Sequence, residues 1–236
     1  MTVDYKKDID EAPGLSAPDG GRKIYFVRHG KTEWNNQFRY QGATNVPLCA
    51  EGMEQANRAG LRLSKLDIDA VICSPLDRAF ETAGRIAAYH PGLRIEKNPL
   101  LSEVNFGEWE GLTVPEIKAH SGEELFYKWR RNELHVSVPG GESADAVYER
   151  ASRAAEELVS RLEERIVVVG HGAMFRALFL PLLGIPRSNI FWKMRIDNCS
   201  ISAVSVDKNG KVTLSFLNDT LHMLVPEDEI ADLPLA

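Results

Sequence analysis

The sequence is most informative at Lys23-Ile-Tyr-Phe-Val-Arg-His-Gly-Lys-Thr-Glu-Trp-Asn35. Its first part, Ile24–Val27, is a short run of β-branched and aromatic residues, which is typical of a buried strand. Arg28-His29-Gly30 follows directly and supplies a fixed cation, an imidazole and a residue without a side chain. In open α/β sheets, ligands bind at the carboxyl ends of the strands. A histidine beside an arginine at that end is well placed to attack an anionic group, and phosphate is the obvious candidate.

The 236-residue chain is long enough to bury one substantial core, so we expect a single domain with a smaller insertion. Its composition, 44% apolar and 26% charged, is ordinary for a globular protein. The net charge of −6 argues against a general nucleic-acid binder, although a phosphate pocket needs only a few converging cations. No uncharged apolar run is long enough to cross a bilayer, so we expect no membrane partner.

The cysteines and the two terminal segments indicate where the protein is located and which parts of it are flexible. Cys49, Cys73 and Cys199 have an odd count and no CxxC spacing, which favours reduced thiols in a cytoplasmic protein over disulfides or a zinc site. Residues 1–21 are polar and acidic without an apolar core, so they do not resemble a secretory signal. Their Pro, Gly, Asp and Ser content predicts a flexible extension. Residues 226–236 are acidic, and we expect a loose tail.

Strand and helix patterns alternate along the main domain, residues 22–225. Buried strands are expected at Ile24–Val27, Ala70–Cys73, Leu93–Glu96 and Ile166–Gly170, and helices at Glu51–Leu66, Ser74–Tyr89, Ser143–Glu164 and Ala173–Leu183. Ser74 and Ser143 are expected to cap their helices, whose buried sides include Phe80 and Leu162 respectively. Two alternating segments, Ser200–Val206 and Lys211–Phe216, flank a hairpin turn signal. The pattern predicts a three-layer α/β/α sandwich with a mostly parallel sheet and C-terminal hairpin strands.

The segment at residues 101–141 differs in character, because it is rich in Glu, Gly and Trp. Short helices are expected at Val114–His120 and Glu123–Arg131, so we interpret the segment as a small helical cap inserted over one end of the sheet. The aromatic residues near it are Trp34, Phe106, Trp109, Phe126 and Trp129. They either frame a substrate mouth or pack under the cap, and packing is the equal or better interpretation.

The order of strand followed by His-Gly occurs twice. Ile166–Val169 runs into Gly170-His171-Gly172, so two parallel strands would bring both imidazoles to one edge of the sheet. Gly172 opens a helix, whose first free N–H groups can also point at an anion. Arg78 stands on the first turn of another helix that follows a strand. Two arginines and two histidines that converge at strand ends predict a phosphoryl-binding site.

Four motifs taken together resemble those of the histidine phosphatase superfamily, in its phosphoglycerate-mutase-like branch. They are Arg28-His29-Gly30, Ser74–Arg78, Leu101-Ser102-Glu103 and Gly170-His171-Gly172. The similarity extends from about Lys23 to His222, and the motifs stand in the right order at predicted strand ends. The C-terminal stretch Asn218–His222 is also similar to the ending of α-ribazole phosphatases, although this does not name a substrate.

The resemblance implies a role for each matching residue. His29 resembles the nucleophile that accepts the phosphoryl group, and Glu103 resembles the general acid that protonates the leaving alkoxide and then activates water. The phosphate-binding groups would be Arg28, Asn35, Gln41, Gly42, Arg78 and His171, with the helix start at Gly172. These roles fit the chemistry of the reaction, because phosphoryl transfer depends mainly on positioning and charge stabilisation. A covalent intermediate also divides one hard step into two easier ones.

The acid/base segment Leu101–Gly111 resembles the phosphatase side of the superfamily. Mutases carry a longer, more basic insertion that helps to hold a bisphosphorylated cofactor, whereas only Leu112–Glu142 separates this segment from the later helix. We therefore favour hydrolysis of a small phosphorylated metabolite without a cofactor, and keep a cofactor-dependent phosphoglycerate mutase as the alternative. Lys31 stands where many relatives have an acidic residue, which would add positive charge near the pocket.

Two other classes are less well supported. A metal hydrolase could use His29 and His171 as zinc ligands, but neighbouring arginines would repel the cation and no carboxylate cluster accompanies them. A non-catalytic phosphate- or nucleotide-binding module is the second. Gly30-Lys31-Thr32 mimics the end of a P-loop without its first glycine, and Phe175 replaces the third glycine of a dinucleotide fingerprint.

Several remaining residues receive no catalytic role. Glu108 and Glu110 are expected to be solvated, His222 is expected to be a solvated C-terminal residue rather than a pocket residue, and His90, His120 and His135 are left without a function. The oligomeric state stays open, with a homodimer among the alternatives.

Overall fold

The computed structural model describes residues 21–131, 136–187 and 193–235. Within them a six-stranded sheet has the order β3-β2-β4-β1-β5-β6. The strands are β1 (Arg22–Arg28), β2 (Ala70–Cys73), β3 (Ile95–Lys97), β4 (Arg165–Gly170), β5 (Ile201–Val206) and β6 (Val212–Asp219). Neighbours from β3 to β1 are parallel, and β5 runs antiparallel to both β1 and β6. The predicted mostly parallel sheet with a C-terminal hairpin is confirmed.

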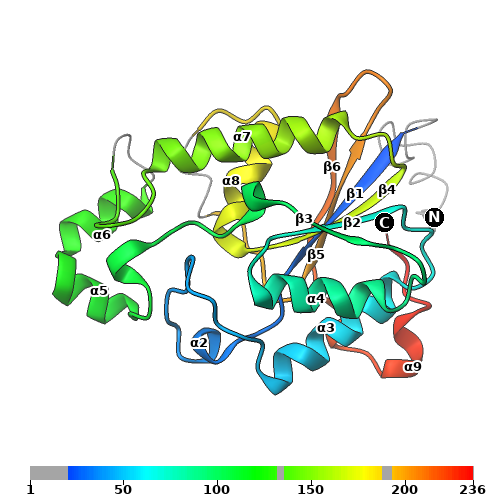
Figure 1. The fold of residues 1–236 in the computed structure, drawn as a ribbon, viewed down its shortest axis with the longest axis horizontal. Helices are drawn as coiled ribbons and strands as arrows, with labels where there is room; N and C mark the ends of the chain where they lie inside the picture. The colour runs from blue at the N-terminus through cyan, green and yellow to red at the C-terminus, as the bar shows by residue number, and fades with distance from the viewer. Residues whose placement is uncertain (1–20, 132–135, 188–192, 236) are drawn as a thin grey trace, which may run out of the picture.

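Helices cover both faces of the sheet (Figure 1). On one face lie α7 (Ala144–Ser160) and α8 (Gly172–Leu182), and on the other lie α3 (Ala50–Leu63) and α4 (Asp77–Ala87). The alternation of side chains along β1 explains the two layers, because successive residues of a strand point to opposite faces. Ile24 and Phe26 belong to one apolar cluster, with α7 and α8, whereas Tyr25 and Val27 belong to the other.

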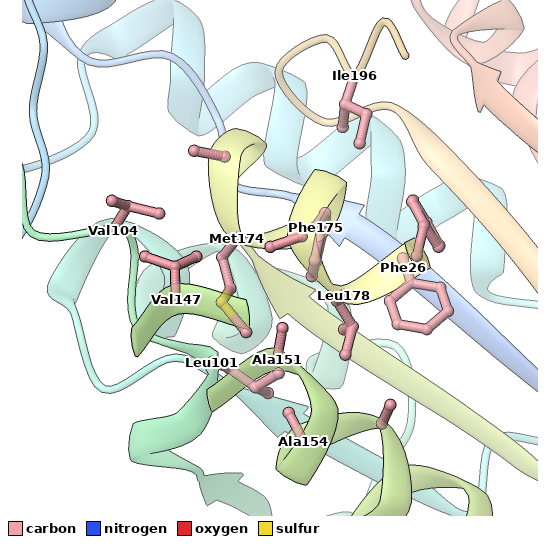
Figure 2. Close-up of a cluster of buried hydrophobic side chains, with 14 of the residues drawn as sticks. Phe26, Leu101, Val104, Val147, Ala151, Ala154, Met174, Phe175, Leu178 and Ile196 are labelled. Carbon is pink, nitrogen blue, oxygen red and sulfur yellow. The ribbon is translucent and has the colours of Figure 1, made fainter. Parts of the chain in front are cut away.

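The cluster between β1, α7 and α8 fixes the start of α8 relative to the sheet (Figure 2). Phe26 meets Phe175 and Phe179 edge to face, with ring centroids 5.5 and 5.0 Å apart. A Cβ on Gly170 would lie 2.6 Å from the Phe175 ring, so only glycine fits at the end of β4. The N-terminus of α8 is thereby held directly at the carboxyl end of the strand.

The expected cap is formed by α5 (Val114–Ser121) and α6 (Glu123–Arg130), which lie at one end of the molecule (Figure 1). Trp109 is fully buried there, with ring centroids 5.9 and 5.4 Å from Phe126 and Trp129. Tyr40 joins the group from the main domain, 6.0 Å from Trp129. Trp109, Phe126 and Trp129 therefore pack under the cap, whereas Phe106 and Tyr40 also line the cavity of the candidate site.

Three local predictions about the helices are wrong. Ser74 does not cap α4, whose N-cap is Leu76, because the Ser74 hydroxyl is engaged elsewhere. Leu162 is 89% exposed, because α7 ends at Ser160. Phe80 is 39% exposed and lies under the Lys97 ammonium, 3.8 Å from its ring centroid. Ser143 does cap α7, since its side chain accepts a hydrogen bond from the Ala146 N–H.

The C-terminal residues are packed, so the prediction of a loose tail is wrong for the described part. A short helix, α9 (Glu227–Ile230), lies near α3 in Figure 1, and Ile230 is fully buried. The guanidinium of buried Arg62 donates to the Pro234 carbonyl at 2.5 Å and to Asp219 at 3.1 Å. A buried arginine needs such partners, and here the tail supplies one.

Some predictions lie outside the described residues. These are the N-terminal extension, apart from Gly21, and the part of the cap that contains His135. Among the helices described, none has both the length and the apolar character to span a membrane.

Candidate active site

The carboxyl ends of β1 and β4 lie side by side and carry the two histidines. Arg28 pairs in register with Gly170, and the His29 N–H donates to the Gly170 carbonyl at 2.9 Å. The ring centroids of His29 and His171 are 5.1 Å apart. The structure thus brings together the two imidazoles that the repeated His-Gly order predicts at one edge.

A cavity of about 140 Å³ opens at this edge. It is lined by all the predicted site residues except His171, namely Arg28, His29, Asn35, Gln41, Gly42, Arg78, Glu103 and Gly172. His171 is fully buried beside His29 and contributes no surface to the cavity. Pockets for drug-sized ligands hold roughly 300–1,000 Å³. The cavity therefore suits a phosphoryl group on a small skeleton better than a nucleotide.

His29 is held in a form that can act as a nucleophile. Its Nδ1 lies 2.7 Å from the Gly30 carbonyl, which can only accept, so Nδ1 carries the proton and Nε2 keeps its lone pair. Burial, followed by the charges of Arg78 and Arg28, lowers the pKa of His29 well below its usual value. The imidazole is therefore neutral at pH 7.

The backbone at Gly30 has no room for a side chain. A Cβ there would lie 2.3 Å from the Gly52 carbonyl oxygen of α3, and the Gly30 N–H donates to Thr82 Oγ1 at 3.1 Å. These contacts fix the carbonyl that holds the His29 ring.

His171 is connected through its other nitrogen. Its Nε2 lies 2.7 Å from Ser74 Oγ, and its Nδ1 is buried without a hydrogen-bond partner among the described residues. Ser74 Oγ also accepts the Leu76 N–H at 3.3 Å. The pKa of His171 is lowered well below its usual value, by burial first and then by Arg78. Both imidazoles are thus neutral, but their ring nitrogens have different hydrogen-bond partners.

Two arginines stand beside the histidines and are held by carbonyl groups rather than by acids. Arg78 is fully buried and donates to Thr44 and Gly42 carbonyls at 2.8 and 2.7 Å. Arg28 donates to the Ile196 carbonyl at 2.7 Å. Burial lowers the pKa of Arg78 to about 10, so it is still protonated at pH 7. The positive charges remain available to an anion in the cavity.

Glu103 lies at the N-terminus of α8. Its Oε1 accepts the Met174 and Val104 N–H groups at 2.8 and 2.9 Å, and its Oε2 accepts the Ala173 N–H at 3.2 Å. The expectation that the first N–H groups after Gly172 are open to a bound anion is therefore wrong for two of them. A helix N-terminus attracts the nearest carboxylate, and here it places the predicted acid at the cavity wall.

Asn35 and the loop at Gln41-Gly42 complete this wall. Asn35 Oδ1 accepts the Thr32 N–H at 3.1 Å and Asn198 Nδ2 at 3.3 Å, which leaves its own amide N–H groups for a ligand. Gln41 is 7% exposed, and its Oε1 has no partner within the described ranges. Gly42 has φ +56°, which glycine tolerates best.

Glu110 is not solvated as predicted. Its carboxylate accepts the N–H groups of Ala43, Thr44 and Phe106 at 2.8, 2.9 and 3.1 Å, so it ties the loop at Gln41-Gly42 to the cap segment. Hydrogen bonds between loops that are far apart in the chain cannot be predicted from the local sequence.

His222 and Lys31 also differ from expectation. His222 is fully buried, with Nε2 3.0 Å from the Cys199 carbonyl, and burial lowers its pKa to about 4. It does not line the cavity. Lys31 pairs with Glu51 at 2.5 Å and is also absent from the cavity wall, so its charge is not directed at the site.

The sequence carried no signal for the segment at residues 194–198, which supports three site residues. The Met194 carbonyl accepts Arg176 Nε at 2.8 Å, the Ile196 carbonyl accepts Arg28 as described above, and Asn198 Nδ2 donates to the His29 carbonyl at 2.9 Å. The side chains of Arg39, Tyr40 and Arg176 also line the cavity and received no role from the sequence.

Within the described ranges, no group of three or more His, Cys, Asp and Glu side chains is arranged to hold a metal ion. The cavity instead combines a neutral histidine with a lone pair, buried cations and one carboxylate. This arrangement can bind a phosphoryl group, accept it covalently and exchange a proton with its ester oxygen.

Comparison with known proteins agrees with this class of site. The model of the histidine phosphatase superfamily (branch 1) matches residues 24–220. Phosphoserine phosphatase 1 of Hydrogenobacter thermophilus is 35% identical, over 85% of this chain and 94% of that protein. Adenosylcobalamin/alpha-ribazole phosphatase of Escherichia coli is 30% identical, over 83% and 95%.

A solved structure has the same fold. A phosphoserine phosphatase variant from Entamoeba histolytica, in complex with phosphoserine, superposes with a TM-score of 0.75 at 27% identity, over 86% of this chain and 99% of that one. The chain belongs to the histidine phosphatase superfamily. It is a phosphatase, a phosphomonoester hydrolase of the histidine type.

Proposed function

We propose that the chain hydrolyses a small phosphorylated metabolite through a phosphohistidine at His29, without a metal ion. The observation that carries the proposal is the state of His29. Its ring is neutral, its Nδ1 is bound to a carbonyl so that Nε2 keeps its lone pair, and the residue lines a cavity together with Arg28 and Arg78. This combination supports nucleophilic attack on phosphorus and stabilises the charge on the transferred group.

In the first step, His29 Nε2 forms a bond to phosphorus while the bond between phosphorus and the ester oxygen breaks. Glu103 gives its proton to the leaving alkoxide. We assign that proton to Oε2, because Oε2 accepts one hydrogen bond at 3.2 Å whereas Oε1 accepts two shorter ones. In the second step, Glu103 takes a proton from water, the water oxygen bonds to phosphorus, and the Nε2–P bond breaks to release phosphate.

The groups that hold the phosphoryl oxygens follow from the cavity wall. Arg28 and Arg78 supply buried positive charge, and the Asn35 amide supplies a neutral donor. His171 contributes from beside His29: if Ser74 Oγ donates to its Nε2, the buried Nδ1 carries a proton that meets no acceptor in the described part of the chain. The Gln41-Gly42 loop closes the site next to the cap.

The names of the relatives do not agree on a substrate, because one refers to phosphoserine and another to alpha-ribazole. The limited cavity volume, about 140 Å³, supports a small phosphate ester. A cytoplasmic location and a homodimer are further hypotheses. The absence of disulfides among Cys49, Cys73 and Cys199 supports the first, and sedimentation of the purified protein tests the second.

Hydrolysis of p-nitrophenyl phosphate with excess EDTA tests the proposal. We expect full activity of the wild type, loss of activity in His29→Ala, and normal activity in His120→Ala, whose exposed ring pairs with Glu108 outside the cavity. Activity that EDTA abolishes would support a metal hydrolase instead. Interconversion of phosphoglycerates that requires added bisphosphoglycerate would support the mutase, and nucleotide binding without turnover would support the binding module.

A further inference from the structure

The segment between β3 and the cap carries Glu103, and a side chain of α7, Arg150, holds its backbone. Arg150 Nη1 donates to the Leu100 and Ser102 carbonyls at 2.9 and 2.7 Å. Its Nη2 lies 3.4 Å from the Glu103 carbonyl. A buried carbonyl needs a hydrogen-bond donor, and in this irregular stretch the guanidinium supplies it. Arg150 therefore contacts the main chain of the proposed acid and of the residues just before it.

Glu142 fixes the guanidinium and also binds the segment on the other side of Glu103. Its Oε1 and Oε2 accept Arg150 Nε and Nη2 at 2.9 and 2.8 Å, a two-point contact that sets the plane of the guanidinium. Glu142 Oε2 also accepts the Asn105 N–H at 2.8 Å, and the Glu142 N–H donates to the Asn105 carbonyl at 2.9 Å. The ion pair thus binds the chain both before and after the proposed acid.

Arg150 also meets the helix start that binds the Glu103 carboxylate. Its Nη1 lies 3.2 Å from Met174 Sδ, and the Met174 N–H donates to Glu103 Oε1 at 2.8 Å. Leu101 and Val104 belong to the same apolar cluster as Met174 (Figure 2). Apolar burial is not directional, whereas hydrogen bonds to carbonyl oxygens are. The apolar contacts therefore hold the segment against the core, and Arg150 sets the orientation of its peptide groups.

We infer that Arg150, oriented by Glu142, is a positioning residue that holds Glu103 where its carboxyl group reaches the leaving oxygen. This inference rests on the proposed function, in which Glu103 protonates the leaving group. Neither Arg150 nor Glu142 lines the cavity, so neither is placed to touch the substrate. Proton transfer requires hydrogen-bond distance, and a displacement of about 1 Å can lower the rate by about 10²-fold.

Two aryl esters test the inference. Phenyl phosphate and p-nitrophenyl phosphate share a ring, but phenolate is the more basic leaving group and depends more on a proton from Glu103. In Arg150→Gln we expect kcat/KM to fall by about 10- to 100-fold for phenyl phosphate and by less than about threefold for p-nitrophenyl phosphate. Arg150→Lys should give an intermediate loss, because an ammonium cannot bind the carboxylate at two points. Arg153→Gln, a change at an exposed residue of the same helix, should alter neither rate.

Glu142→Gln is a second variant with a milder change. It removes the charge that orients Arg150 but keeps the guanidinium donors, so the same selective loss with phenyl phosphate is expected at a smaller size. Circular dichroism on heating shows which variants are folded. This variant and Arg150→Lys carry the test if Arg150→Gln does not fold.

The double variant Glu103→Gln with Arg150→Gln separates positioning from general support of the fold. If Arg150 acts through Glu103, the second substitution should lower kcat/KM for phenyl phosphate by less than about threefold in the Glu103→Gln background. Unchanged rates or equal losses with both esters in Arg150→Gln, or full additivity in the double variant, would overturn the inference and leave the phosphatase mechanism intact. Equal losses with both esters in Glu103→Gln would instead overturn the assigned acid, on which the inference rests.

Discussion

Two segments of the molecule, residues 24–30 and 166–172, have the same local form: a buried strand that ends in His-Gly. They are neighbours in the sheet, and their imidazoles lie 5.1 Å apart. Yet His29 binds a backbone carbonyl through Nδ1, whereas His171 binds a serine hydroxyl through Nε2. Only His29 reaches the cavity.

We infer from this contrast that the hydrogen-bond partner, rather than the local sequence, sets the proposed role of each histidine. The His29 ring meets the carbonyl of its own next residue, so its reactive nitrogen is set by local geometry. The partner of His171 comes from a residue 97 positions away in the chain. The second segment also starts α8, whose N-terminus holds Glu103. One segment supplies the proposed nucleophile, and the other supports it and the proposed acid.

The largest expected effects are the losses of kcat in His29→Ala and His171→Ala. His29→Ala should lower kcat on the order of 10⁴-fold or more, because the proposed nucleophile is lost. His171→Ala should lower kcat by about 10²- to 10³-fold, the range for losing one stabilising donor. Steady-state kinetics with p-nitrophenyl phosphate measure both, and a larger loss in His171→Ala would reverse the assignment of roles.

Glu103→Gln should distinguish leaving groups. With an alkyl phosphate, whose alkoxide needs a proton, we expect kcat/KM to fall by about 10²- to 10⁴-fold. With p-nitrophenyl phosphate, whose leaving group is a weak base, the loss should be less than about tenfold. Glu108→Gln is the matched control, since that carboxylate is exposed and does not line the cavity. Equal losses with both esters would argue against a general acid at this position.

Ser74→Ala tests the support of the second histidine. It removes the hydroxyl that orients His171, so we expect kcat to fall by about tenfold, which corresponds to one hydrogen bond of roughly 1.4 kcal/mol. Ser205→Ala is the control, because this buried serine bonds to Ser215 on the hairpin, away from the cavity. An unchanged rate in Ser74→Ala would mean that the bond has no part in holding the site.

The smallest effect concerns stability against pH. The unfolded chain protonates its histidines as the pH falls below about 6.5, whereas buried His222 resists protonation down to about pH 4. The unfolded state thus binds more protons in this window, and the free energy of unfolding should decrease as the pH falls. Each such histidine contributes up to about 1.4 kcal/mol per pH unit.

Urea denaturation between pH 7 and pH 4 measures this dependence. His222→Gln should flatten it, because glutamine keeps a donor for the Cys199 carbonyl but does not titrate. An unchanged slope in His222→Gln would contradict the lowered pKa.

Much of the site could be predicted from the sequence because its residues follow strands directly. His29 and Gly172 stand at strand ends, and Arg78 stands on the first turn of a helix after a strand, so the topology alone brings them together. The order of elements and the cap were predictable for the same reason: apolar periodicity and turn signals are local properties of the chain.

The remainder depends on contacts between distant segments. Glu110 and Asn198 have no local pattern that indicates what their side chains bind, and each reaches a loop far away in the chain. Ser74 looks like a helix cap because it precedes Pro75, but its hydroxyl is engaged by His171 instead. The acidic tail looked loose because Ile230, the buried apolar residue in its described part, is not distinguished by composition from exposed apolar residues.

The most direct test of the account is to trap the phosphoenzyme. Purified protein is mixed with radiolabelled phosphate ester in excess EDTA, quenched in denaturant at alkaline pH, and digested for peptide mapping. The account predicts one acid-labile phosphoryl group per chain on the peptide that contains His29, and none in His29→Ala. Label on the peptide of His171, or turnover that depends on metal and leaves no phosphohistidine, would contradict it.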